Sequence, residues 1–227
     1  MDRRAIESRA RELLGEIWQY RERFFPMGVP NPIDMLRPEI AAEVLGFSYQ
    51  HSGPLGTWGQ GGDHFEIAGL LDRQRRHIAV STNFEFAVSR FTAAHEIGHV
   101  ALNHSGLVMH RDRPVFQLED HRRDPFEQDA DYFSACYLAP GKLVKEAFFQ
   151  RFRIRPPLPL TDAIAFHLCG ESGHALMAAG PSSLKFPAAV ARATTFNGRP
   201  FVSLYKMFDI SISAMAIRLR ELGLVEE

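Results

Sequence analysis

Apolar residues recur at steps of three and four along the first part of the chain. The positions concerned are Ile6, Ala10, Leu13, Leu14, Ile17, Trp18 and Phe24. This spacing places them on one face of an α-helix, so an amphipathic helix is predicted over residues 4–25. The proline-rich stretch that follows breaks this helix. A second helix is predicted over residues 37–45, and Gly46 ends it.

The middle of the chain has shorter apolar runs and many glycines. Residues 53–65 are the most glycine-rich segment and are predicted to form a loop. This segment lacks the lysine and the following helix of a phosphate-binding loop, which argues against a phosphate site. Two apolar runs follow, at 65–71 and 77–82, and indicate an antiparallel pair of strands. The charged cluster between them, at 72–76, is typical of a solvent-exposed hairpin tip.

Helical spacing returns in the second half of the chain. It predicts helices over residues 89–103 and 125–138, with Pro140 beyond the end of the latter. The intervening residues 107–123 are predicted to be irregular.

The rest of the chain has weaker patterns. Residues 155–160 contain three prolines and indicate a rigid connector, and a short helix is predicted over 161–169. One or two helices are predicted over 201–225. The pattern as a whole predicts an α+β protein that is mainly helical, with a small antiparallel sheet near the middle.

Charge and composition exclude several classes of protein. The chain has 26 basic and 27 acidic residues and a net charge of −1. Such a balance gives no broad positive field for nucleic acid or for an anionic membrane. The apolar runs are shorter than the roughly 20 residues of a membrane span, and charges interrupt the N-terminal segment where a signal peptide would be apolar. The two cysteines, Cys136 and Cys169, form no paired metal motif. We therefore expect a cytoplasmic protein with no direct nucleic-acid or membrane binding.

Residues 95–99, His-Glu-Ile-Gly-His, form an HExxH motif. On a helix, His95 and His99 lie one turn apart on the same face, so both imidazoles can reach one ion at about 2.0–2.1 Å. Glu96 can reach a water at that ion without binding the ion itself. Gly98 in mid-helix costs about 1 kcal/mol relative to alanine. That cost indicates a close neighbour or a need for open space at the cleft.

A catalytic zinc site needs a third protein ligand. Metzincins require glycine and histidine where this chain has Leu102 and Ser105, so that class is excluded. Glu127 is the better candidate, and Asp131, one turn further along, can accept a hydrogen bond from a ligand histidine. Glu127 also fits an N-terminal capping pattern that begins at Asp124, so spacing alone leaves both roles open. Phe126, Phe133 and Tyr137 are expected to pack into the core from the other side of this helix.

Other residues compete for these roles. His110 and His121 are rival ligands in the irregular stretch, although a lone histidine in a charged loop is usually solvated. A group that holds a developing oxyanion has five candidates: His104, Tyr132, His167, His174 and Tyr205. Zn²⁺ is the expected ion, and two imidazoles with one carboxylate would also accept Mn²⁺ or Fe²⁺.

The segments HEIGHVALNH and EQDADYFSACYLAP together resemble the ImmA/IrrE family of metallopeptidases. The likeness extends to NPIDMLRPEIAAEVLGFSY, to RFTAAHEIGH and to MFDISISAMAIRLRELGLV. It covers residues 30–50, 78–140 and 205–225, about half of the chain. This combination and order of segments is far more specific than HExxH alone.

The resemblance implies a zincin-like fold and a set of roles. His95, His99 and Glu127 would be the zinc ligands and Glu96 the catalytic base, as in gluzincins. Asp131 stands where the family usually has asparagine, so its supporting role is an expectation from spacing. The peptidase domain would occupy residues 1–140. Residues 141–204 match no part of the family pattern. We expect residues 141–227 to form a helical extension that ends in a helix-turn-helix-like tail, packs on the peptidase domain and helps to shape the substrate cleft.

The resemblance also implies a function. The chain would be a zinc-dependent endopeptidase that cleaves a protein partner, an Xre-type helix-turn-helix repressor, in a stress-response or mobile-element switch. The alternative is a non-catalytic toxin–antitoxin or protein-interaction module in which the metal braces the fold. A third hypothesis, a DNA-reading tail, is disfavoured because residues 206–225 carry three basic and two acidic side chains.

Overall fold

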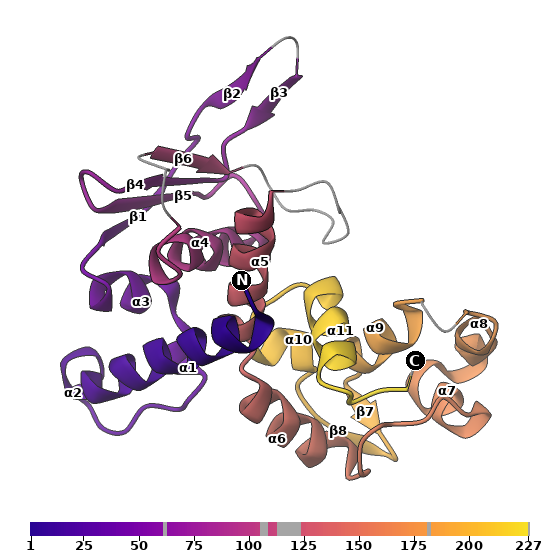
Figure 1. Cartoon of the computed structure of the whole chain (residues 1–227). Coiled ribbons are helices and arrows are strands. Elements are labelled where there is room, and N and C mark those ends of the chain that lie inside the picture. Colours follow the sequence, from indigo (N-terminus) through magenta and orange to yellow (C-terminus); the bar gives the residue numbers. More distant parts are fainter. Residues whose placement is uncertain (61–62, 105–108, 113–123, 181–182, 227) are drawn as a thin grey trace. The chain divides into compact units, whose positions relative to one another are not determined.

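The computed structural model describes residues 1–60, 63–104, 109–112, 124–180 and 183–226, and of residues 59–60, 63–65 and 109–112 it describes the backbone alone. The chain divides into two compact units, Met1–Leu138 and Ala139–Glu227 (Figure 1). Each unit is described by itself.

The first unit holds both of the helices predicted to carry the metal site. In chain order its elements are α1 (Arg3–Gln19), α2 (Arg21–Phe24), the 3-10 helix η1 (Asp34–Leu36), α3 (Pro38–Val44), β1 (Ser48–Ser52), β2 (Thr57–Gln60), β3 (Asp63–Glu66), β4 (Gly69–Asp72), β5 (His77–Ser81), α4 (Phe86–Ala101), β6 (Met109–Asp112) and α5 (Pro125–Leu138). The first predicted helix is confirmed as α1 and α2, which are separated at Tyr20. Its apolar face is buried through Ile6, Ala10, Leu13 and Ile17.

The main sheet has four strands in the order β1-β5-β4-β6. The predicted antiparallel pair is confirmed as β4 and β5. The sheet is mixed rather than wholly antiparallel, because β1 joins β5 in parallel. β6 pairs with β4 although this stretch was predicted to be irregular. Its sequence, Met-His-Arg-Asp, has no apolar alternation, and an edge strand can form without one.

The glycine-rich segment also differs from its prediction. Residues predicted to form a loop instead contribute the antiparallel hairpin of β2 and β3, in which Trp58 is paired with Phe65. The hairpin projects away from the four-stranded sheet (Figure 1). Two glycines at 61–62 separate the strands in the sequence, which is itself a common hairpin signal.

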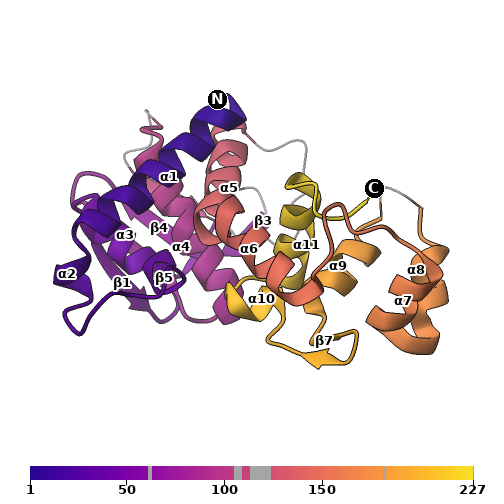
Figure 2. The ribbon, with the colours of Figure 1, turned by 90° about the horizontal axis from the view of Figure 1, so that it is seen from below.

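Helices α4 and α5 form the centre of the first unit. α4 packs against β4 and β5, α5 packs along α4, and α1 packs on α5 (Figures 1 and 2). Every residue of α4 from Ser89 to His99 is buried, so this stretch of the helix has no solvent-exposed face. Ile97 contributes to the same core as Leu71 and Ile78 of the sheet, all with no exposed surface.

The segment around η1 holds both central helices. A guanidinium N–H of Arg90 on α4 donates to the carbonyl of Leu36 over 2.8 Å. The hydroxyl of Tyr137 on α5 donates to the carbonyl of Arg37 over 3.0 Å. Burial raises the pKa of Tyr137 above its usual range, so the hydroxyl remains a donor. The segment around η1 therefore fixes α4 and α5 to neighbouring points of its backbone.

Helix α5 packs closely against α4 at Gly98. A Cβ atom at residue 98 would lie 3.2 Å from the Cα and the carbonyl oxygen of Ala130 and 3.2 Å from the ring of Phe133. Of the two explanations that the sequence left open for Gly98, a close neighbour and open space at the cleft, this geometry supports the close neighbour.

The second unit contains short helices and one small hairpin. Its elements are α6 (Gly141–Phe152), α7 (Asp162–Cys169), the 3-10 helix η2 (Gly170–Gly173), α8 (His174–Met177), α9 (Lys185–Arg192), β7 (Thr195–Phe196), β8 (Arg199–Pro200), α10 (Leu204–Met207) and α11 (Ile212–Glu221). α11 packs on α9. Arg218, one of the basic residues of the tail, is buried and donates to the carbonyl of Ala139 over 3.0 Å. The Arg218 guanidinium is therefore hydrogen-bonded inside the second unit.

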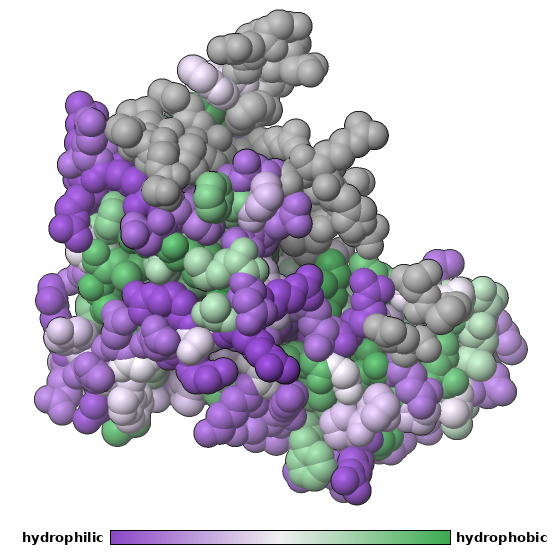
Figure 3. Space-filling model, in the orientation of Figure 1, coloured by the Kyte–Doolittle hydropathy of each residue, from purple (hydrophilic) through white to green (hydrophobic). Residues whose placement is uncertain are grey.

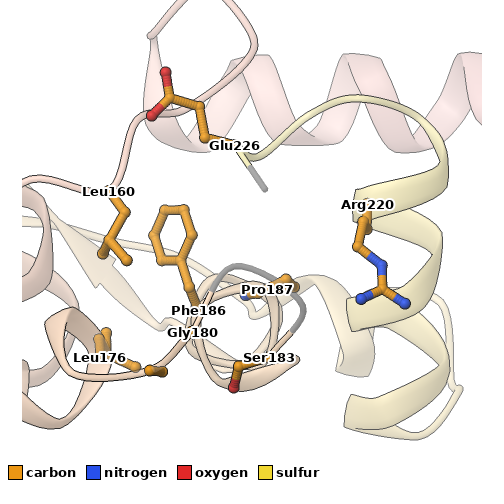
Figure 4. Close-up of a pocket in the computed structure, with 9 residues that line it drawn as sticks. Leu160, Leu176, Gly180, Ser183, Phe186, Pro187, Arg220 and Glu226 are labelled. Atoms are coloured by element: carbon orange, nitrogen blue, oxygen red, sulfur yellow. The ribbon is translucent and has the colours of Figure 1, made fainter.

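A cavity of about 250 Å³ lies within the second unit. Its lining includes the apolar side chains of Leu160, Leu176 and Phe186, with Arg220 and Glu226 on other sides (Figure 4). None of the residues predicted to bind metal lines it.

The surface mixes hydrophilic and hydrophobic residues over the face shown in Figure 3. Large apolar side chains that are exposed, such as Met27, Phe86 and Phe166, are far apart in the sequence. Within the described part of the chain, no helix is both long and apolar enough to cross a bilayer. The predicted α+β, mainly helical, zincin-like class is confirmed.

The close approach at Gly98 yields a stability prediction. In Gly98→Ala the methyl group meets backbone atoms of α5, and overpacking of this kind costs typically about 1–3 kcal/mol, more than the roughly 1 kcal/mol gained in helix propensity. We expect a lower free energy of unfolding, measured by urea denaturation. Gly15→Ala in α1 is the control, because no atom lies within 4 Å of the added carbon, and it should stabilise the protein. Equal stabilisation by both substitutions would contradict the close packing.

Candidate metal centre

Three potential ligand side chains meet between α4 and α5. His95 and His99 have no exposed surface, and their Nε2 atoms are 2.9 Å apart. Glu127 places Oε2 3.2 Å from His95 Nε2 and Oε1 3.3 Å from His99 Nε2. The structure thus brings together the three residues predicted to bind the metal, in a group that could hold one ion.

The spacing of these atoms fits a small divalent ion. Ligand atoms bound tetrahedrally at about 2.0–2.1 Å would lie roughly 3.3 Å from one another. The two Nε2 atoms are 2.9 Å apart, and the two carboxylate oxygens of Glu127 lie 3.2 Å from His95 Nε2 and 3.3 Å from His99 Nε2, respectively, so each imidazole has a carboxylate oxygen close to that separation. Two imidazoles and one carboxylate are a typical donor set for catalytic zinc, in which one coordination position remains open. Donor chemistry and spacing therefore agree.

The first turn of α5 separates the two roles that the sequence left open for Glu127. Asp124 Oδ1 accepts a hydrogen bond from the backbone N–H of Phe126 over 2.8 Å and so caps the helix. Glu127 turns towards the imidazoles. Phe126 is 46% exposed, so the expectation that it packs in the core is wrong, whereas Phe133 and Tyr137 are fully buried.

Asp131 lies behind His95. Its Oδ1 atom is 2.8 Å from His95 Nδ1, as expected from the one-turn spacing between Glu127 and Asp131. A carboxylate accepts, so His95 donates through Nδ1 and keeps its Nε2 lone pair directed towards Glu127 and His99.

His104 lies behind His99. The two Nδ1 atoms are 2.9 Å apart, and the backbone N–H of His104 donates to the carbonyl of His99 over 3.1 Å. His104 is only 3% exposed, and the ring of Phe126 lies 4.8 Å from its ring. Burial, and then the neighbouring His99, lower the pKa of His104 to about 4, so its ring is neutral at neutral pH.

Glu96 is fully buried beside β4. A Cβ atom at residue 69 would lie 2.8 Å from Glu96 Oε1 and 2.6 Å from Thr92 Cγ2. Gly69 therefore leaves the space that the Glu96 carboxylate occupies. Sequence reasoning missed this glycine because the contact joins residues far apart in the chain.

The charged turn at 72–76 was predicted to be a solvent-exposed tip, but the side chain of Arg73 contacts α4. One of its guanidinium N–H groups donates to the carbonyl of His99 over 2.6 Å. Burial lowers the pKa of Arg73, and the nearby carboxylate of Glu96 opposes that shift. The side chain of Arg75, in the same turn, is 84% exposed, as the prediction expected for the whole cluster.

One of the remaining oxyanion candidates, Tyr132, has a partner on α1. Its hydroxyl donates to Glu7 over 2.6 Å. His167, His174 and Tyr205 belong to the second unit. The side chains of His110 and His121 lie outside the described residues.

A comparison with protein families supports this site. Residues 53–159 match the family model of the IrrE N-terminal-like domain, Peptidase_M78. The matched segment contains both metal-site helices, α4 and α5, and continues into the second unit. The match confirms the resemblance to the ImmA/IrrE family and supports metallopeptidase chemistry. No curated protein matches the chain.

The hydrogen bond behind His95 can be tested by metal affinity. Loss of such a partner typically weakens metal binding about 10–100-fold, so we expect this loss in Asp131→Ala, measured by competition with a zinc chelator. Asp131→Asn keeps an acceptor oxygen and should bind zinc more tightly than Asp131→Ala. Asp129→Ala is the control on the same helix, because that carboxylate pairs with the N-terminal amine at 2.6 Å. Wild-type affinity in Asp131→Ala would disprove a supporting role.

Proposed function

We propose that this chain, whose residues 53–159 form an IrrE N-terminal-like peptidase domain, is a metal-dependent endopeptidase. The observation that carries the proposal is the convergence of His95, His99 and Glu127 with Glu96 buried on the same helix as the two histidines. A binding module would need the ligands alone, whereas hydrolysis also needs a carboxylate that does not bind the metal.

The residues have distinct parts in the proposed reaction. When bound, zinc supplies Lewis-acid polarisation of the scissile carbonyl and lowers the pKa of water. Glu96 takes a proton from the attacking water and later delivers it to the leaving amine. His95, His99 and Glu127 hold the ion, and Asp131 orients His95 through Nδ1. Gly69 keeps the space of the Glu96 carboxylate clear.

The proposed substrate is a protein, and an Xre-type repressor fits the family resemblance best. Cleavage would inactivate the repressor in a stress-response or mobile-element switch. The site is proposed to operate in the cytoplasm without direct contact to nucleic acid.

The alternative is a protein-interaction module in which the metal only braces the fold. The buried Glu96 disfavours it, because an ionisable side chain with no exposed surface is costly and a purely structural metal site does not require it. The two functions differ in whether a partner is cut or only bound.

Glu96→Gln separates these two functions. Loss of a general base typically lowers the rate about 10²–10⁴-fold, so co-expression with a repressor from a neighbouring gene should yield a fragment with the wild type and almost none with the variant. Zinc content should be unchanged. Glu22→Gln is the control, because the Glu22 side chain is 89% exposed. A biological effect that persists in metal-loaded Glu96→Gln would instead support the binding module.

Gly69→Ala tests the placement of the base. The added methyl group would lie within 3.0 Å of Glu96 and Thr92 and must displace one or both. Because small misplacements of reacting groups can cost about 10²-fold in rate, we expect cleavage to fall by that order. Zinc affinity should change little, since the contact does not involve a ligand. Gly15→Ala provides the matched substitution, and full cleavage by Gly69→Ala would contradict the placement.

A further inference from the structure

The two proposed zinc-binding histidines have chemically different supports. His95 is backed by the carboxylate of Asp131 at 2.8 Å, and His99 is backed by the imidazole of His104 at 2.9 Å. A carboxylate can only accept, so it fixes the tautomer of His95 by itself. An imidazole can donate or accept through Nδ1. The support of His99 therefore depends on which ring nitrogen of His104 carries the proton.

We propose that His104 is a positioning residue, which holds His99 ready for metal binding by accepting a hydrogen bond from His99 Nδ1. The proposal rests on the proposed metallopeptidase function, because it requires His99 to bind the ion. His99 Nε2 faces Glu127 and His95, so Nε2 is the atom that would bind. The proton of His99 must then be on Nδ1. Only a lone pair on His104 Nδ1 can accept it, so the proton of His104 is on Nε2.

Several contacts keep the His104 ring in this orientation. Its backbone N–H is bound to the carbonyl of His99, just beyond the end of α4. The ring is 3% exposed and lies against Phe126, the residue before Glu127. Arg73 donates to the same His99 carbonyl. The chain thus holds His104 from the end of α4 and the start of α5.

The burial of His104 also argues against the oxyanion role considered from the sequence. A group that stabilises an oxyanion must reach the substrate carbonyl. Here Nδ1 is taken by His99, and the ring lies inside the protein. The position of His104 suits a residue that acts through a ligand.

Two substitutions and one spectrum test the proposal. His104→Leu removes the acceptor, and zinc affinity measured by chelator competition should fall about 10–100-fold. His104→Asn places an amide oxygen near the position of Nδ1 and should restore most of that affinity. These measurements need no substrate.

The tautomer is read directly from the wild type. A long-range ¹H–¹⁵N correlation spectrum of the zinc-loaded protein should show the proton of His104 on Nε2. A proton on Nδ1, or zinc affinity unchanged in a folded His104→Leu variant, would overturn the proposal. Equal losses in His104→Leu and His104→Asn would also overturn it, because an acceptor at this position would then make no difference to zinc binding. Failure of the wild type to bind zinc would refute the metal centre itself, whereas zinc binding without proteolysis would refute only the peptidase function.

Discussion

The candidate site depends on the closeness of α4 and α5 at one point. Ala130 of α5 lies against Gly98 of α4, where a methyl group would already be crowded. Ala130 stands between Glu127 and Asp131 in the sequence, so the point of contact lies in the turn that carries both carboxylates. A wider separation would move both carboxylates away from the histidines together. Gly98 lowers the helix propensity of α4 locally. It also lets α5 approach closely enough for Glu127 and Asp131 to reach the histidines.

Polar groups buried around this contact are costly unless they have a use. His95, Glu96, His99 and His104 are all buried at the centre of the first unit. Such departures from local rules are expected at functional sites. The hydrogen bonds of His95 and His99 are directed so that both Nε2 atoms face Glu127. This common direction is the physical reason to interpret the cluster as a metal centre rather than as a set of buried polar residues.

The sequence predicts best where a strong period and a motif coincide. Helices α4 and α5 lie close to their predicted positions because apolar spacing and Pro125 define them locally. HExxH indicates two ligands because one turn of helix separates them. The choice between ligand and cap for Glu127 needed the tertiary pairing of the helices, since only there does its carboxylate lie beside His95 and His99.

Contacts between distant segments were beyond sequence reasoning. Gly69 and Arg73 reach the site from the β4–β5 hairpin, and no spacing along the chain predicts which turn residue faces inward. His104 was considered, but for a different role, because its position after the end of α4 does not reveal the direction of its ring. β1 and β6 were missed because polar strands of four or five residues carry almost no periodic signal.

The central claim is that α4 and α5 together hold one metal ion. X-ray absorption spectroscopy of the zinc-loaded protein at the zinc edge tests it most directly. We expect one zinc per chain, coordinated by two imidazoles and one carboxylate oxygen. The spectrum of a Glu127→Ala variant should lack the contribution of that oxygen. Zinc coordinated by sulfur, or a spectrum that is unchanged in Glu127→Ala, would contradict it.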